Sequence, residues 1–270
     1  MRYNQARMKK HLLMCPADYF GIGYDINPWM HEGQPVNSAL AKKQWQRVYD
    51  IYTKQMGWQV ELCAPAEHLP DMVFATDCCL MINRKILLAN YRYPERQPEA
   101  EQFEKCLRSR GYTNISTATH KFEGGDNLLC GDKILAGWGF RSDPEAANEL
   151  HEYFGLEVVP LRLTDPSFYH LDTCVAVLSS DTVALYPDAL DKPSQQRLRA
   201  AIPHLIEATL EEARSFGLNA VSNGHTVITS NESESLLQKY RDAGFTVIGT
   251  PILEFRKSGG GVKCMTLEIR

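Results

Sequence analysis

Lys121-Phe-Glu-Gly-Gly-Asp126 is the stretch of sequence that decides the fold, because its plan recurs along the chain. An apolar run leads into a polar or ionisable residue, a short turn follows, and a second apolar run begins. The same plan is seen in Asp71-Met-Val-Phe-Ala-Thr-Asp77, Phe168-Tyr-His-Leu-Asp172 and Asn219-Ala-Val-Ser-Asn223. The recurrence indicates that one structural unit is built several times.

The copies are almost evenly spaced. Phe74, Phe122 and Phe168 fall 48 and 46 residues apart, and Ala220 follows 52 residues later. A period of about 50 residues is typical of propellers and related closed arrays. Each unit of such an array would carry its ionisable residues toward a common axis, so the repeat predicts a fold and the place of an active site together.

Each of the first three copies is followed by a hairpin signal and a second short apolar strand. These signals are Asn83-Arg84-Lys85, Gly131-Asp132-Lys133 and Ser179-Ser180-Asp181. With the helices between copies, this predicts an α/β array of about five strand–hairpin–helix–strand units. We expect the first strand, 10–15, and the last, 265–269, to complete one unit between them. An α/β sheet that alternates strands and helices without cyclic symmetry remains the alternative.

Apolar residues at helical spacing predict the helices. The expected ranges are 38–56, 98–110, 144–154, 195–202, 206–216 and 233–243, with Ser38 as the N-cap of the first. No linker or break in composition interrupts them. One catalytic domain over residues 1–270 is therefore expected.

The composition of the 270-residue chain excludes several classes of protein. Its net charge is −4, and no polybasic run suggests binding to nucleic acid. No apolar stretch approaches the roughly 20 residues that span a bilayer. The run Leu12–Cys15 is too short for the apolar region of a signal peptide. Eight cysteines without a C-x-x-C pair favour a reducing compartment, so we expect a cytoplasmic protein.

The repeat places ionisable residues at equivalent ends of strands. They are Asp77, Glu123, Asp126, His170, Asp172 and, in the last unit, Cys264. Taken singly, Cys264 could be a core thiol and His170 a strand histidine. Together they supply a nucleophile, a general acid/base and a carboxylate that orients the imidazole. The aspartates suit a planar, donor-rich cation such as a guanidinium. No phosphate-binding, dinucleotide-binding, zinc-protease or serine-hydrolase motif competes.

Three motifs resemble those of the guanidine-modifying penteins. They are Phe122-Glu-Gly-Gly-Asp126, His170-Leu-Asp172 and Gly259-Gly-Gly-Val-Lys-Cys264. This superfamily contains arginine deiminases, dimethylarginine dimethylaminohydrolases, arginine dihydrolases and glycine amidinotransferases. The resemblance runs from Met14 to Ile269. Within the group, Met14-Cys-Pro, Ile26-Asn-Pro-Trp-Met30, Pro70-Asp-Met-Val-Phe74 and Gly139-Phe-Arg-Ser142 are most similar to the bacterial arginine dihydrolase branch.

The resemblance implies a five-bladed, pseudo-symmetric α/β propeller (a pentein) of ββαβ-type units, with no metal or organic cofactor. It implies that Cys264 is the nucleophile, and that His170 is the general acid and base, oriented by Glu123. Asp77 and Asp172 would hold the guanidinium of a small-molecule substrate. Arg141 and Arg96 would hold its carboxylate, and Asn27, which matches the dihydrolase pattern, would also bind the substrate. Asp126 would support the Glu123 turn. A homo-oligomer is left open.

Two positions bear on the substrate and the product. The dihydrolase branch usually has Asn where this chain has Asp77, whereas deiminases and amidinotransferases have Asp. Dimethylarginine hydrolases usually lack an acid at the position of Asp172. We therefore expect hydrolysis of unmethylated arginine to citrulline and ammonia. Arginine dihydrolysis to ornithine, hydrolysis of dimethylarginine and amidino transfer remain alternatives, and a non-catalytic pentein binding module is disfavoured because Cys264, His170 and Glu123 are all present.

Overall fold

The computed structural model describes residues 9–270, so the basic segment 1–8 lies outside the described residues. Five three-stranded sheets make up its framework. Their strands are β3 (Cys79–Ile82), β4 (Lys85–Leu88) and β5 (Ile115–Thr117); β6 (Asn127–Cys130), β7 (Lys133–Trp138) and β8 (Glu157–Arg162); β9 (Val175–Val177), β10 (Thr182–Leu185) and β11 (His204–Glu207); β12 (Val221–Ser222), β13 (Thr226–Ser230) and β14 (Thr246–Thr250); and β15 (Leu267–Ile269), β1 (His11–Met14) and β2 (Gln59–Leu62).

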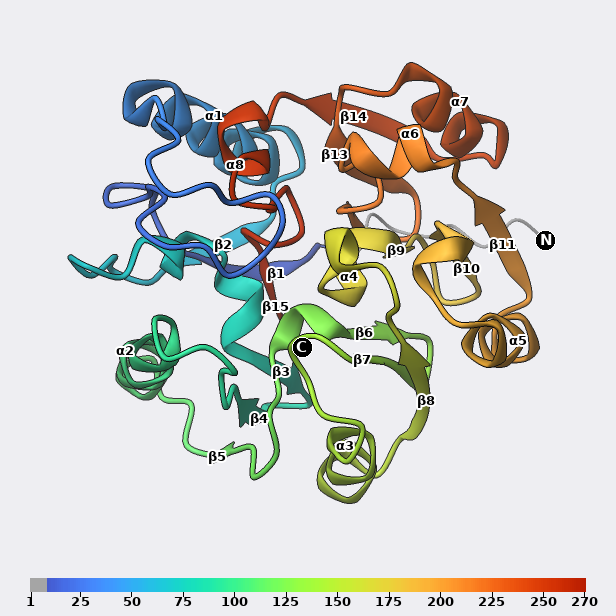
Figure 1. Cartoon of the computed structure of the whole chain (residues 1–270), viewed down its shortest axis with the longest axis horizontal. Coiled ribbons are helices and arrows are strands. Elements are labelled where there is room, and N and C mark those ends of the chain that lie inside the picture. Colours follow the sequence, from blue (N-terminus) through green and yellow to red (C-terminus); the bar gives the residue numbers. More distant parts are fainter. Residues whose placement is uncertain (1–8) are drawn as a thin grey trace.

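All five sheets share one pairing pattern. The middle strand runs antiparallel to the first strand and parallel to the third. A helix connects the second strand to the third, because parallel neighbours need a long crossover. These helices are α1 (Ser38–Asp50), α2 (Gln97–Ser109), α3 (Ala146–Phe154), α5 (Lys192–Ala201) and α7 (Glu234–Asp242). The repeated ββαβ unit is thus confirmed, and Figure 1 shows its five copies arranged around the middle of the molecule.

One sheet joins the two ends of the chain. β15 pairs antiparallel with β1, with Leu12 opposite Glu268, and β1 pairs parallel with β2. In Figure 1 the red strand β15 accordingly lies beside the blue strand β1. The prediction that the first and last strands complete one unit is confirmed.

Two details of the predicted helices are wrong. Residues 206–216 do not form one helix, because Leu205 and Ile206 pair with β10 in strand β11. A separate helix, α6 (Leu210–Arg214), starts after a Thr209 capping box, so strand pairing outweighs local helix propensity here. The N-cap of α1 is Asn37 rather than Ser38, since its side chain accepts a hydrogen bond from the Leu40 amide.

The first strand of each sheet faces a common interior. Residues of β3, β6, β9, β12 and β15 all line one cavity of about 480 Å³. A short turn precedes each of these strands. The turns include Ala75–Cys78 before β3, Gly124–Asp126 before β6 and the one-turn helix α4 (Leu171–Cys174) before β9. Equivalent turns therefore bring residues from all five units toward one place.

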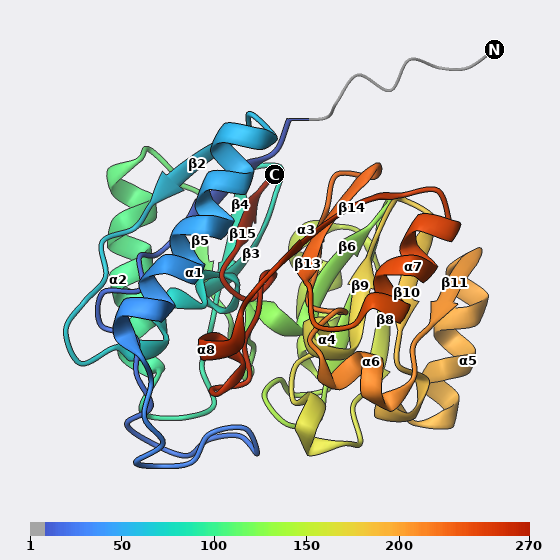
Figure 2. The ribbon, with the colours of Figure 1, turned by 90° about the horizontal axis from the view of Figure 1, so that it is seen from above.

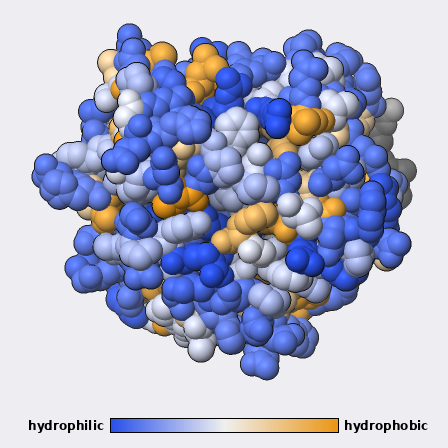
Figure 3. All heavy atoms as spheres, viewed as in Figure 1, coloured by the Kyte–Doolittle hydropathy of each residue, from blue (hydrophilic) through white to orange (hydrophobic). Residues whose placement is uncertain are grey.

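The outer surface is mostly polar. Figure 3 shows a largely hydrophilic face with scattered apolar side chains. The large apolar side chains that are exposed come from separate segments: Tyr19, Leu40, Leu62, Leu210 and Leu253. Within residues 9–270, no helix has the length and apolar character that a membrane crossing would need.

Candidate active site

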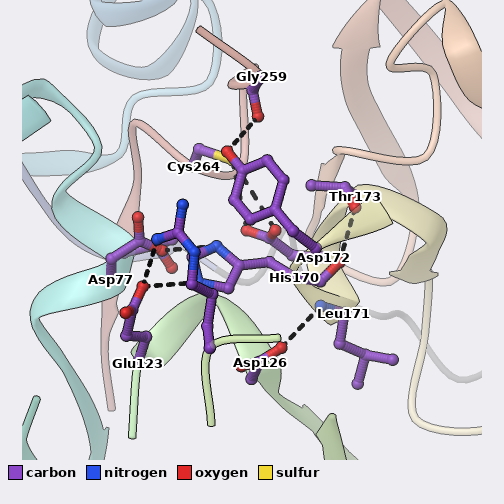
Figure 4. Close-up of polar contacts among 12 residues, drawn as sticks. Asp77, Glu123, Asp126, His170, Leu171, Asp172, Thr173, Gly259 and Cys264 are labelled. Atoms are coloured by element: carbon purple, nitrogen blue, oxygen red, sulfur yellow. Dashed lines mark hydrogen bonds and ion pairs between the residues drawn. The ribbon is translucent and has the colours of Figure 1, made fainter. Parts of the chain in front are cut away.

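His170 lies at the centre of the predicted site. It is the N-cap residue of α4, and only 1% of its surface is exposed. Its Nε2 lies 2.9 Å from Oε2 of Glu123, and its Nδ1 lies 3.5 Å from Oδ1 of Asp77. Figure 4 shows the imidazole between these two carboxylates, which come from the turns of two other units.

The surrounding acids hold His170 in its charged form. Burial lowers the pKa of an imidazole, but Asp77 and the hydrogen bond to Glu123 outweigh it and raise the pKa of His170 to about 9. At neutral pH the ring is therefore an imidazolium. It can give a proton to a leaving group without first taking one from solvent.

Glu123 is ionised although it is fully buried. Burial opposes ionisation, but Arg141 and His170 hold the pKa of Glu123 well below its usual range. Arg141 Nη1 donates to its Oε2 at 2.9 Å, and the guanidinium lies over the rings of Tyr93 and Tyr169 at 4.8 and 4.6 Å. A negative, immobile Glu123 is the kind of group that fixes an imidazole in orientation and charge.

Cys264 faces a second buried acid. Its Sγ lies 3.6 and 3.8 Å from the two oxygens of Asp172, and neither residue exposes more than 2% of its surface. Burial and the charges of Asp172 and Asp77 raise the pKa of the Cys264 thiol well above its ordinary value. Burial also raises the pKa of Asp172 to about 7. A cation placed between them would reverse both effects, because it favours the thiolate and the carboxylate alike.

The remaining carboxylates form a cluster around Arg96. Its Nη1 donates to Oδ2 of Asp77 at 2.7 Å, and its Nε and Nη2 donate to the carboxylate of Glu99 at 3.0 and 2.8 Å. Asp71 completes the cluster, with Oδ2 at 3.9 Å from Nε of Arg96. Three carboxylates thus share one guanidinium, and Oδ1 of Asp77 and of Asp71 are buried without a hydrogen-bond partner among residues 9–270. Unsatisfied buried acceptors are costly, so this cluster is suited to receive a cation.

Three predicted substrate-binding residues already have partners. Arg141 is bound to Glu123, and Arg96 to Asp77 and Glu99. Asn27 donates to the Ser258 carbonyl at 3.1 Å and accepts from the amides of Trp29 and Met30. Their assignment to the substrate therefore stays a prediction. Asp126 accepts from the Ser142 hydroxyl at 2.6 Å and the Leu171 amide at 3.1 Å, which joins the turn before β6 to α4.

The segment between β1 and α1, residues 15–37, covers the site. Tyr24 donates to Asp71, the Ile26 carbonyl accepts from Arg141 at 3.1 Å, and Trp29 donates to the Ser167 carbonyl at 2.7 Å. This segment lies at the lower end of the view in Figure 2, on the side of α8 (Leu253–Arg256). It closes the site over groups that are almost wholly buried.

Asp71, Glu99 and Asn219 are members of the site that sequence reasoning missed. Asp71 and Asn219 lie within the repeated segments, and that position is the signal that could have found them. Glu99 shares the buried face of α2 with Phe103 and Leu107, four and eight residues further on, so an acid on an apolar face was its signal. Among the described residues, no group of three or more His, Cys, Asp or Glu side chains is arranged to hold a metal ion.

Residues 27–270 match the family model for N,N dimethylarginine dimethylhydrolase, eukaryotic. The chain belongs to this family. It is 40% identical to the N(G),N(G)-dimethylarginine dimethylaminohydrolase of Mycobacterium tuberculosis, over 95% of this chain and 84% of that protein. It is also 37% identical to the bifunctional arginine dihydrolase/ornithine cyclodeaminase AgrE of Nostoc sp.. That match covers 95% of this chain but only 37% of the length of AgrE.

Solved structures of both branches share the fold of this family member. The N-terminal domain of ArgZ, a cyanobacterial arginine dihydrolase bound to product, has a TM-score of 0.92 at 35% identity and 97% and 98% coverage of the two chains. A dimethylarginine dimethylaminohydrolase adduct with S-methyl-L-thiocitrulline has a TM-score of 0.82 at 25% identity and 97% and 100% coverage. The predicted class, a cysteine-dependent hydrolase of guanidino C–N bonds in the pentein superfamily, is confirmed by this membership.

Replacing Glu123 with glutamine should lower the pKa of His170 by at least about one unit, since the imidazolium loses a charged hydrogen-bond partner. An NMR titration of the His170 ring nitrogens measures this directly. Glu149→Gln is the matched control, because Glu149 binds the amides of Thr119 and His120. An unchanged His170 titration in Glu123→Gln would show that the other nearby acids, Asp77 and Asp126, hold the charge.

Proposed function

We propose that the protein hydrolyses the guanidinium group of L-arginine to citrulline and ammonia through a covalent intermediate on Cys264. One observation carries the proposal: a thiol and an imidazolium lie between the buried carboxylates of Asp77 and Asp172, and Oδ1 of Asp77 has no hydrogen-bond partner within residues 9–270. A planar cation with several N–H donors can donate to both carboxylates at once. Family membership supports the same substrate class.

Substrate binding prepares the nucleophile. The guanidinium would donate to Asp77 and Asp172, which holds its plane in place for attack. Its positive charge offsets the carboxylates that keep the Cys264 thiol protonated, so binding favours the thiolate. Asp172 can take the departing thiol proton, since its Oδ2 lies 3.6 Å from Sγ.

The covalent cycle uses one proton shuttle. Sγ of Cys264 attacks the guanidinium carbon, His170 gives its proton to a terminal nitrogen, and the carbon–nitrogen bond breaks to release ammonia. His170, now neutral, takes a proton from a water molecule that adds to the thiouronium carbon. The carbon–sulfur bond then breaks, the hydroxyl proton of the adduct passes to solvent, and neutral citrulline leaves. Asp172 returns its proton to the Cys264 thiolate, and His170 is again an imidazolium, so all three groups regain their starting states.

Hydrolysis of dimethylarginine is the second candidate, favoured by the matching family model and the relative of Mycobacterium tuberculosis. The buried Asp172 favours the unmethylated substrate, because a carboxylate accepts an N–H but leaves a methyl group in a polar contact. Separate incubation with L-arginine and with asymmetric dimethylarginine, followed by mass detection of citrulline, ornithine, ammonia and dimethylamine, distinguishes them. Faster release of dimethylamine than of ammonia would refute the preference for arginine. Capture of the amidino group by an added amine would identify a transferase.

Asp77 should decide where the reaction stops. A carboxylate pairs well with a guanidinium but repels the oxygen of neutral citrulline. The unmodified protein should therefore release citrulline once one nitrogen has been removed, without hydrolysing it further. Asp77→Asn can donate to that oxygen and should shift part of the product to ornithine with a second ammonia. Asp71→Asn, in the same cluster, is the control and should leave citrulline as the product. Ornithine as the main product of the unmodified protein would show that the argument from Asp77 is wrong.

Arg141 should bind the α-carboxylate of the substrate. Arg141→Gln should raise KM for arginine by about tenfold or more relative to agmatine, which lacks the carboxylate, since a bidentate pair is lost. Steady-state kinetics on both substrates provides the comparison. Equal losses on the two would assign Arg141 to the support of Glu123 alone.

The repeat also supports a closed five-bladed arrangement that forms one catalytic domain. Each sheet has the same strand order, and β15 joins β1. Cooperative unfolding that is identical by fluorescence and by circular dichroism would agree with one domain. Two separate transitions would contradict it.

A further inference from the structure

Asn219 lies in the turn that leads into the first strand of its unit, as Asp77, Glu123, His170 and Cys264 do in theirs. It lies two residues before β12, and it is fully buried. The side-chain amide makes four hydrogen bonds. Oδ1 accepts from the backbone amides of Lys263 at 2.8 Å and Cys264 at 3.1 Å, and Nδ2 donates to the Asp172 carbonyl at 2.9 Å and to Sγ of Cys264 at 3.0 Å.

These partners fix which end of the amide faces the sulfur. Backbone N–H groups can only donate, so the oxygen of Asn219 must face Lys263 and Cys264. A backbone carbonyl can only accept, so the nitrogen must face Asp172. Both lone pairs and both hydrogens are then used, and the second N–H necessarily lies against Sγ. The orientation follows from the network and does not depend on an arbitrary choice between oxygen and nitrogen.

Apart from the backbone of Gly261, which also lowers the pKa of the Cys264 thiol, the sulfur has few other sources of stabilisation as an anion. Its near neighbours include both oxygens of Asp172, and the site is buried, so its surroundings favour the neutral thiol. Within residues 9–270, Asn219 is the only side chain that donates a hydrogen bond to Sγ. A donor held at 3.0 Å favours whichever state carries negative charge on sulfur.

We propose that Asn219 is a further catalytic residue, which stabilises the Cys264 thiolate through its side-chain N–H. The proposal rests on the proposed function. The N–H acts twice in the cycle: it favours the thiolate that attacks, and it stabilises the same thiolate when it leaves at the end of hydrolysis. The side-chain oxygen of Asn219 accepts from the amides of Lys263 and Cys264 and so fixes the turn that contains Cys264. Its hydrogen bond to the Asp172 carbonyl holds the backbone of Asp172 in place beside the sulfur.

Asn219→Asp distinguishes the role of the side-chain oxygen from that of the side-chain N–H. Aspartate keeps an oxygen for the amides of Lys263 and Cys264 but replaces the N–H donor with an acceptor. Asn219→Ala removes all four bonds. Asn223→Asp is the matched control, because Asn223 lies four residues away and its Oδ1 also accepts from two backbone amides, those of His225 and Thr226.

The test measures alkylation of Cys264 by iodoacetamide from pH 6 to 10, with the labelled peptide quantified by mass spectrometry. Below the thiol pKa the rate is proportional to the thiolate fraction. Asn219→Ala should lower the rate at least tenfold at each pH, Asn219→Asp should lower it further, and Asn223→Asp should match the unmodified protein. The kcat should fall at least as much as the alkylation rate in both Asn219 variants, with KM for arginine changed by less than about threefold.

A folded Asn219→Asp protein that is alkylated at the unmodified rate would overturn the proposal, as would an equal loss in Asn223→Asp. Should the Asn219 variants not fold, NMR on the unmodified protein decides the question. The side-chain amide signal of Asn219 should move with the ionisation of Cys264 and not in Cys264→Ala, and a pH-independent signal would refute the assignment. Alkylation and NMR need no turnover, so failure of the proposed reaction and failure of this inference are separate results.

Discussion

Cys264→Ala should abolish turnover, with a loss of at least about 10⁴-fold in kcat, because no covalent bond to the guanidinium carbon can form. Binding should survive, since the carboxylates proposed to receive the guanidinium belong to Asp77 and Asp172. Isothermal titration with L-arginine should therefore give a Kd within about tenfold of the KM of the unmodified protein. Mass spectrometry of the unmodified protein, quenched during turnover, should detect an adduct on the Cys264 peptide.

Cys130→Ala is the matched control. Cys130 is as buried as Cys264, but it lies in β6, with its thiol against the carbonyls of Ser179 and Ser180. Its replacement should leave kcat within about threefold. Retained turnover in Cys264→Ala would remove the covalent mechanism, whereas a large loss in both variants would indicate general damage to the core.

His170→Asn should lower kcat by at least about 10³-fold, because the leaving nitrogen receives no proton and cannot depart as ammonia, and the attacking water keeps its proton. The pH profile of the unmodified protein provides a second check. His170 must be protonated to start the cycle, so activity should fall as the pH rises through its pKa of about 9. A plateau that continues well above pH 9 would argue against His170 as the acid.

The free energy of unfolding should also depend on the protonation of His170. The folded pKa of His170 is above its ordinary value of 6.5, so its stabilising contribution is fully present below about pH 6.5 and is lost as the pH rises through about 9. His170→Asn should therefore be destabilised relative to the unmodified protein at pH 6, and this difference should shrink by pH 10. Denaturant unfolding at the two pH values measures it. A difference that is constant with pH would mean that the charge of His170 does not contribute to folding.

The repeat made most of the fold predictable. Recurring motifs, hairpin signals and helical spacing gave the ββαβ unit, because these features are local. Ile206 and Glu207 were misassigned to a helix because their state depends on pairing with β10, which lies about 20 residues earlier in the sequence. Local pattern contains no information on which distant strand is available.

The site was predictable only in part, for a related reason. Cys264, His170 and Glu123 are recognisable by chemistry, since a nucleophile, an imidazole and an acid form a known set. Asn219 is not, because an amide is neutral and common, and its role appears only when four partners from distant segments are seen around it. The predicted substrate contacts of Arg141 and Arg96 were likewise inferred without knowing that Glu123, Asp77 and Glu99 lie beside them.

The pairing of β15 with β1 has a consequence for biosynthesis. A ribosome makes β1 before, and β15 after, the other strands of residues 9–270. Lys10 and Glu268, which form an ion pair, are accordingly separated by 258 positions. The acids and the imidazole can reach their places while the nascent chain grows, but the turn that carries Cys264 has no partner strand until β15 emerges. Among the proposed catalytic residues, Cys264 is therefore the last to reach its place in the fold. In the proposed reaction, a chain whose synthesis stops before Cys264 would contain the carboxylates that bind the guanidinium but would lack the nucleophile that acts on it.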